Sequence, residues 1–69
     1  MDKEEIMNLL DGYGYRHERE CKGTYKVYMY ENQIEELKKD TGLNIDVFEI
    51  HRGEYRFDNY ILMNIEEVD

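Results

Sequence analysis

Few side chains in this sequence are of the types that act as catalytic nucleophiles. The chain of 69 residues contains no serine, and its single cysteine is Cys21. A cysteine nucleophile needs a histidine base, here His17 or His51, within hydrogen-bonding distance. On an extended strand, the four-residue step from His17 to Cys21 places the two side chains about 13 Å apart. We therefore predict no Cys–His catalysis, no catalytic residues and no enzymatic activity.

Patterns for binding a metal or a phosphate group are equally weak. Histidine, cysteine and carboxylates occur together at 17–21 and 46–51, but their spacing matches no zinc template. A phosphate-binding glycine loop precedes a helix, whereas the glycines at 12 and 14 follow a predicted helix. We expect no metal and no cofactor. A cysteine without a partner indicates a reducing compartment, so we also expect a cytoplasmic location.

The acidity of the chain is its strongest functional signal. Seventeen acids against nine bases give a formal net charge of −8. A surface of this sign repels phosphate backbones and attracts basic partners. The acids concentrate in two predicted helices and in the C-terminal tail. The predicted partner-binding surface comprises Glu4, Asp11, Glu31, Glu35, Glu36, Asp40, Glu66 and Glu67.

The leading hypothesis is a small non-enzymatic inhibitor or modulator that occupies a basic surface on a protein partner. Rows of carboxylates can imitate the spacing of phosphates, so we expect a partner that binds nucleic acid. We expect no direct contact with nucleic acid or membrane. In composition the chain is similar to the small acidic anti-defence inhibitors that bacteriophages encode. The other interpretation of these acids is a solvated helix face.

Tyrosine and basic residues gather in the segments predicted as strands. Tyrosine supplies a large, stiff contact area with a polar tip. The predicted aromatic contacts are Tyr13, Tyr28, Tyr30 and Tyr60. An alternative function uses this face to hold a nucleotide or another small phosphorylated ligand. The residues predicted to bind that ligand are Arg16, His17, Arg52 and Arg56.

Two other interpretations of the predicted strands are open. Cross-strand ion pairs account for the mixture of basic and acidic residues without any ligand. A structural homodimer, formed by pairing sheet edges across a two-fold axis, is a third functional class.

Two segments have the features of short amphipathic helices. The first begins with a capping box formed by Asp2 and Glu5 and ends at Gly12-Tyr13-Gly14. The second begins with Asn32 as its cap and ends at Gly42. The apolar residues at helical spacing are Ile6, Leu9 and Leu10 in the first and Ile34 and Leu37 in the second.

Four other segments have the composition of strands. Residues 15–20 and 24–30 flank Cys21-Lys22-Gly23 and predict a hairpin, with Tyr25 in the core. Segment 43–50 changes its apolar phase midway, which predicts either a bulge or a central strand buried on both faces. After a turn at 51–54, residues 55–65 alternate most regularly. We expect its apolar positions, Tyr55 and Phe57 included, to face the core.

These elements have the order αββαββ and predict one α+β domain over residues 1–69. We expect a four-stranded, mainly antiparallel sheet with both helices on one face, in a circular permutation of the ferredoxin-like arrangement. Residues 22–30 align with 52–60, which favours pseudo-twofold half-repeats at 1–30 and 31–69. Two adjacent hairpins with another strand order fit the same pattern. No apolar run approaches the ~18 residues that span a bilayer.

Overall fold

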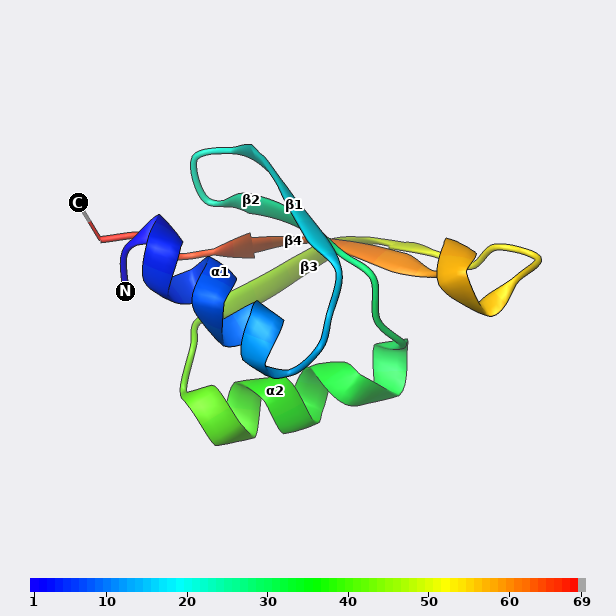
Figure 1. Cartoon of the computed structure of the whole chain (residues 1–69), viewed down its shortest axis with the longest axis horizontal. Helices are drawn as coiled ribbons and strands as arrows, with labels where there is room; N and C mark the ends of the chain where they lie inside the picture. The colour runs from blue at the N-terminus through cyan, green and yellow to red at the C-terminus, as the bar shows by residue number, and fades with distance from the viewer. Residues whose placement is uncertain (69) are drawn as a thin grey trace.

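The computed structural model describes residues 1–68, except for the side chain of Arg56. Two helices and four strands follow one another in the predicted order αββαββ (Figure 1), which confirms the α+β class. The elements are α1 (Lys3–Gly12), β1 (His17–Cys21), β2 (Thr24–Val27), the 3₁₀ turn η1 (Glu31–Gln33), α2 (Ile34–Thr41), β3 (Ile45–His51), the 3₁₀ turn η2 (Arg56–Asp58) and β4 (Tyr60–Ile65).

The predicted capping box of α1 is present. The Asp2 carboxylate accepts a hydrogen bond from the Glu5 N–H at 2.9 Å, and the Glu5 carboxylate accepts one from the Asp2 N–H at 3.3 Å. These bonds satisfy donors that the first helical turn leaves unpaired. Ile6 and Leu10 are buried on the core side of the helix. The chain then leaves α1 through Gly14, whose φ is +79°.

The second helix starts differently from the prediction, and the assignment of Asn32 as its cap is wrong. The backbone first forms η1, and α2 begins at Ile34 without a side-chain cap. The polar side chain that stabilises this start is Gln33, whose Oε1 accepts a hydrogen bond from the Tyr30 N–H at 2.8 Å. The predicted end is confirmed, because Gly42 has φ +70°, which glycine adopts at little cost.

The four strands form one antiparallel sheet with the order β1-β2-β4-β3. The β3 strand therefore lies at an edge, and the prediction that it is a central strand is wrong. The alternative, a bulge, agrees with the pairing, because the register of β3 against β4 shifts between Val47 and Glu49. Phe48 is the extra residue, and an extra residue of this kind changes the face to which the following side chains point.

The strand predicted over residues 55–65 is only partly present. It begins at Tyr60, and residues 52–59 form an arm that extends beyond the end of the sheet (Figure 1, yellow to orange). The arm has no pairing partner among the described strands, because β3 ends at His51, opposite Tyr60. Tyr55 and Phe57 are consequently 57% and 66% exposed. The prediction that they face the core is wrong.

Both helices lie on the same side of the sheet (Figure 1), and the core fills the space between the two layers. Among residues 1–68, no helix covers the opposite face of the sheet. Tyr25 is fully buried, as predicted. The buried core residues are Ile6, Leu10, Tyr25, Val27, Met29, Ile34, Leu37, Ile45, Ile61, Met63 and Ile65.

The predicted internal repeat is not confirmed. Lys22 and Gly23 connect β1 directly to β2, whereas β3 and β4 are connected by the arm at 52–59. Residues 22–30 and 52–60 therefore have different local structures although their sequences align. Within residues 1–68, no helix is long and apolar enough to cross a membrane.

Candidate functional site

The described part of the chain has no cluster of side chains that could form a metal centre. No group of three or more His, Cys, Asp or Glu side chains lies together there in a way that would hold a metal ion. Cys21 is exposed at the end of β1. All of the buried residues that the structure describes are hydrophobic. The candidate sites are therefore surface features.

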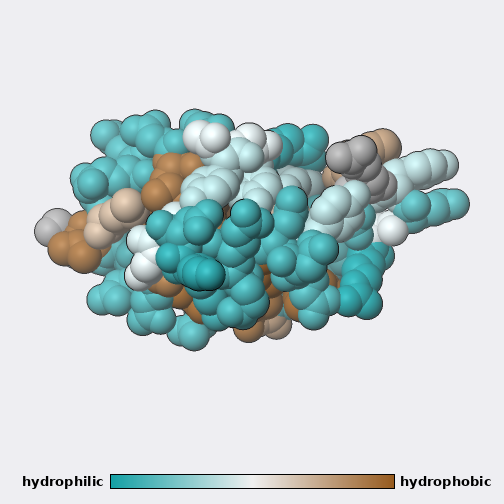
Figure 2. Space-filling model, turned by 90° about the horizontal axis from the view of Figure 1, so that it is seen from below, coloured by the Kyte–Doolittle hydropathy of each residue, from teal (hydrophilic) through white to brown (hydrophobic). Residues whose placement is uncertain are grey.

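The helical side of the molecule carries an excess of acids, which we call the acidic helical layer. Its members all have exposed side chains and belong to α1, η1, α2 and their flanks. They are Asp2, Glu4, Glu5, Asp11, Glu31, Glu35, Glu36 and Asp40. The basic residues of the same elements are Lys3, Lys38 and Lys39. Figure 2, which views the molecule from this side, shows a largely hydrophilic surface.

The C-terminal end of α1 is joined to α2 within this layer by a tyrosine. The Tyr13 hydroxyl donates a hydrogen bond to Asp40 Oδ2 at 3.4 Å, and the Tyr13 ring stacks on Tyr15 with centroids 5.8 Å apart. Partial burial and the charges of Asp40 and Glu36 raise the pKa of Tyr13. The hydroxyl therefore remains a donor, and Tyr13 adds aromatic contact area to an otherwise charged surface.

Three predicted members of the partner-binding surface lie in different environments. Glu31 pairs with Arg52 of the arm, so part of its charge is locally neutralised. Glu66 is exposed directly after β4. Glu67 belongs to the fold and not to a free surface, because its side chain is only 6% exposed. Its oxygens accept hydrogen bonds from Arg19 and from the Tyr25 hydroxyl, which leaves little of the carboxylate for a partner.

The open face of the sheet carries a second feature, a row of aromatic and basic side chains at one end. The Arg16 guanidinium carbon lies 3.9 Å from the centroid of the Tyr28 ring. Tyr28 meets Tyr60 edge to face at 5.8 Å, and His51 stacks on Tyr60 at 4.5 Å. The Lys26 ammonium lies 4.4 Å from the Tyr60 ring. Hydrogen bonds from Lys26 and Arg16 lower the pKa of Tyr28.

Sequence reasoning included Arg16, Tyr28 and Tyr60 but missed Lys26 and His51. Lys26 and Tyr28 are two positions apart on an extended chain, so their side chains share a face. This signal was available in the sequence. His51 is the register partner of Tyr60, and that pairing required knowledge of the bulge in β3.

The predicted ligand-binding residues do not converge on one site. His17 has its Nδ1 2.9 Å from the Tyr15 carbonyl and 3.7 Å from an Asp11 oxygen, which places it beside α1. Arg52 is directed to Glu31. The side chain of Arg56 lies outside the described part of the structure. Of the described members, only Arg16 therefore lies in the aromatic row.

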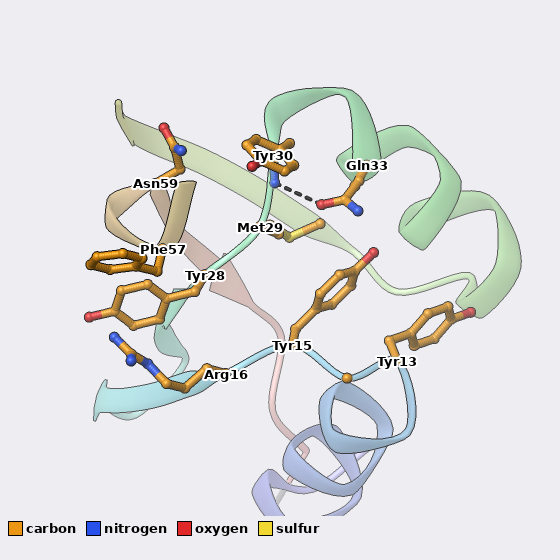
Figure 3. Close-up of a pocket in the computed structure, with 10 residues that line it drawn as sticks. Tyr13, Tyr15, Arg16, Tyr28, Met29, Tyr30, Gln33, Phe57 and Asn59 are labelled. Carbon is orange, nitrogen blue, oxygen red and sulfur yellow. Dashed lines mark hydrogen bonds between the residues drawn. The ribbon is translucent and has the colours of Figure 1, made fainter. Parts of the chain in front are cut away.

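A hollow of about 320 Å³ lies between the C-terminal end of α1, the residues that follow β2 and the arm. Figure 3 shows Tyr28 and Phe57 on one side of it, Tyr13 and Tyr15 on the other, and Met29 between them. We call this space the tyrosine hollow. It is lined by Tyr13, Gly14, Tyr15, Arg16, Tyr28, Met29, Tyr30, Gln33, Phe57 and Asn59.

Three of the four predicted aromatic contacts, Tyr13, Tyr28 and Tyr30, line the tyrosine hollow. Tyr60 lines a neighbouring hollow of about 330 Å³ that shares Arg16, Tyr28 and Phe57 with it. These residues were predicted because tyrosine is enriched in the predicted strands. That enrichment did not indicate which of the tyrosines would lie together.

Comparisons of this chain with protein-family models, with curated proteins and with solved structures found no match.

Proposed function

We propose that this protein is a non-enzymatic inhibitor or modulator that binds a basic surface of another protein through its acidic helical layer. The observation that carries the proposal is charge segregation. Eight exposed acids and three lysines lie in α1, η1, α2 and their flanks, and both helices are on one side of the sheet (Figure 1). A rigid surface of one sign attracts and orients a partner of the opposite sign.

The position of the acids on helices supports a partner that also binds nucleic acid. Glu4, Glu35 and Glu36 form no ion pair within the described residues, so their charges remain available to a partner. The packed core holds the helices that carry them in place. A row of fixed negative charges is complementary to the lysine and arginine side chains that hold a phosphate backbone.

The test reverses charge on the helical layer and compares it with an equal reversal on the sheet. The first variant carries Glu4→Lys, Glu35→Lys and Glu36→Lys, and leaves Asp40 in place because it holds Tyr13. The matched control carries Glu18→Lys, Glu20→Lys and Glu49→Lys, which are exposed residues of β1 and β3. Both variants change the net charge equally.

Affinity capture from a bacterial lysate, followed by mass spectrometry, is the measurement. The wild-type protein and the sheet variant should retain the same basic proteins, and the helical variant should lose them. Binding should also weaken between low and high salt, because salt screens charges on exposed surfaces. Equal retention by the helical variant, or captured proteins that are not basic, would contradict the proposal.

We also propose that the fold is a circular permutation of the ferredoxin-like arrangement. Two observations support it: β4 lies between β2 and β3, and the Val68 N–H donates a hydrogen bond to the Met1 carbonyl at 2.8 Å. Joining the termini by a short glycine linker and opening the arm at 52–59 would give the order βαββαβ. That permuted chain should unfold cooperatively, and a non-cooperative transition would count against the proposal.

A homodimer and a cytoplasmic location remain proposals. The homodimer is supported by the edge position of β1 and β3, because an edge strand has unpaired backbone groups that a second copy can meet. Sedimentation at micromolar concentration should show a species of twice the chain mass. A monomer at that concentration would exclude a stable dimer.

A further inference from the structure

The tyrosine hollow differs in charge from the rest of the molecule. The formal net charge of the chain is −8, yet no Asp or Glu is among the described residues that line this hollow, and one of them, Arg16, is basic. Its other polar groups are tyrosine hydroxyls and the amides of Gln33 and Asn59. We propose that the tyrosine hollow binds a planar aromatic ligand that carries a phosphate group, of the class of the 5′-mononucleotides. This site adjoins the acidic helical layer at Tyr13, whose hydroxyl donates to Asp40, but its proposed ligand is different from the protein partner of that layer.

Aromatic side chains line two opposite sides of the hollow. Tyr28 and Phe57 lie opposite Tyr13 and Tyr15, with Met29 between them (Figure 3). Each side includes a ring of a stacked pair: Tyr15 stacks on Tyr13 with an interplanar angle of 7°, and Phe57 stacks on Tyr55 with an angle of 2°. A nucleobase placed in the hollow would meet ring faces, and stacking of this kind tolerates any base.

The polar groups in the hollow can recognise the edge of a base. Gln33 is held in place because its Oε1 accepts a hydrogen bond from the Tyr30 N–H at 2.8 Å (Figure 3). Its Nε2 makes no hydrogen bond among the described residues and so can donate to a ring nitrogen or carbonyl oxygen of a ligand. The Tyr13 hydroxyl, by contrast, is directed to Asp40.

Arg16 supplies the charge for a phosphate. Its guanidinium lies 3.9 Å from the centroid of the Tyr28 ring, and no carboxylate of the described residues forms an ion pair with it. This cation–π contact holds the guanidinium beside the hollow, and a guanidinium held in this way can bind a phosphate through paired N–H donors. A cationic ligand would be repelled by Arg16, and no carboxylate among the described lining residues would offset that repulsion. The hollow therefore favours an anion.

The size of the hollow and the screening of charge agree with this ligand class. Small-molecule sites usually measure about 300–1,000 Å³, and the tyrosine hollow measures about 320 Å³. The acidic helical layer repels a phosphate at long range, but at physiological ionic strength this repulsion decays over about 8 Å. Asp40 lies beside the Tyr13 side of the hollow, so we expect the phosphate on the opposite side, where Arg16 lies beside Tyr28 (Figure 3).

The experiment titrates the ¹⁵N-labelled protein with AMP, GMP, CMP and UMP and follows amide chemical shifts. Saturable shifts should map to residues 13–16, 28–33 and 57–59, with a dissociation constant on the order of 1 mM or below. Inorganic phosphate alone and the unphosphorylated nucleosides should each bind more weakly than the mononucleotide, because each makes only part of the contacts.

Four variants separate the roles of charge and ring. Arg16→Gln should weaken mononucleotide binding by about tenfold, since it removes the charge-assisted contact, while Lys39→Gln on α2 is the matched control and should leave binding unchanged. Tyr28→Leu should weaken binding by a similar factor, and Tyr28→Phe, which keeps the ring, should retain it. Circular dichroism checks that each variant is folded.

The proposal is overturned if no mononucleotide gives saturable shifts up to about 10 mM, or if Arg16→Gln binds as well as the wild type. Shifts caused equally by inorganic phosphate would also overturn it, because they would indicate only a phosphate contact. Should Tyr28→Leu fail to fold, Arg16→Gln and Tyr28→Phe still decide the question. Mononucleotide binding is measured on the wild-type protein and on variants within the hollow, so its outcome does not depend on the result of the capture experiment with the helical variant.

Discussion

Arg19 and Glu67 form a two-point ion pair that fastens the chain after β4 to the strand at the far edge of the sheet. The Arg19 Nε and Nη2 atoms donate to the two Glu67 oxygens at 2.9 Å each. The hydroxyl of buried Tyr25 donates to the same carboxylate at 2.5 Å. Paired contacts of this geometry are stronger than single hydrogen bonds. The C-terminal segment is therefore part of the folded unit.

Replacing Glu67 by alanine should destabilise the protein. The buried Tyr25 hydroxyl would lose its acceptor, and a buried unpaired donor costs about 1–3 kcal/mol. Urea unfolding followed by circular dichroism measures the change in the free energy of unfolding. The control is Glu66→Ala, an exposed neighbour that should change stability by less than about 0.5 kcal/mol. Equal effects of the two variants would show that the ion pair contributes nothing.

The same carboxylate should make stability depend on pH in the acid range. Hydrogen bonds from Arg19 and Tyr25 lower the pKa of Glu67 from 4.5 to about 2. The folded state therefore releases this proton more readily than the unfolded state, so the contribution is present above pH 4.5 and is lost as the pH falls towards 2. Urea unfolding at several acid pH values should show a smaller loss of stability for Glu67→Gln than for the wild type.

Tyr25 should produce the opposite dependence at alkaline pH. Burial, and then its hydrogen bond to Glu67, raise the pKa of Tyr25 from 10.0 to about 12. The folded state binds this proton more tightly than the unfolded state. The resulting contribution to stability is therefore present below pH 10 and is lost between pH 10 and 12. Ultraviolet titration of tyrosinate should show that the last tyrosine titrates near pH 12, and Tyr25→Phe should remove this last step. A titration with no late step would contradict the assignment.

The capping box of α1 can be tested at Asp2. Asp2→Ala removes the acceptor for the Glu5 N–H and should lower the free energy of unfolding by about 0.5–2 kcal/mol. Asp2→Ser keeps a side-chain oxygen at the cap and should restore most of the loss. Thermal unfolding of the three proteins measures both effects, and a serine variant no better than alanine would exclude a capping role.

Two glycines at helix ends should respond in opposite directions to alanine. Gly42 has φ +70°, where a Cβ is unfavourable, so Gly42→Ala should cost about 1 kcal/mol. Gly12 lies within α1, and a Cβ there would meet nothing within 4 Å. Gly12→Ala should therefore add about 0.5–1 kcal/mol of stability. Urea unfolding gives both values, and changes of the same sign would contradict the two backbone assignments.

Local sequence determined the elements whose signals lie within a few residues. The capping box at Asp2 and Glu5 and the helix end at Gly42 depend only on neighbouring residues, and both are found as predicted. The predicted hairpin is also present, but its loop is one residue shorter, because Cys21 belongs to β1. The order αββαββ followed from them. At Asn32 a competing local bond, from the Tyr30 N–H to Gln33, sets the start of the helix. At residues 55–59 the strand fails because its backbone finds no distant partner strand, since β3 ends at His51.

Tertiary structure alone decided which distant residues meet. Strand order places β4 beside β2, and the bulge at Phe48 aligns His51 with Tyr60. The same packing brings Arg19 to Glu67 across 48 positions and leaves Phe57 beside Tyr28 at the tyrosine hollow. The composition showed that tyrosines and charged residues are abundant, but it did not show which of them are neighbours in space. Those contacts depend on how the strands pair, and residue periodicity carries no information about the order of strands in a sheet.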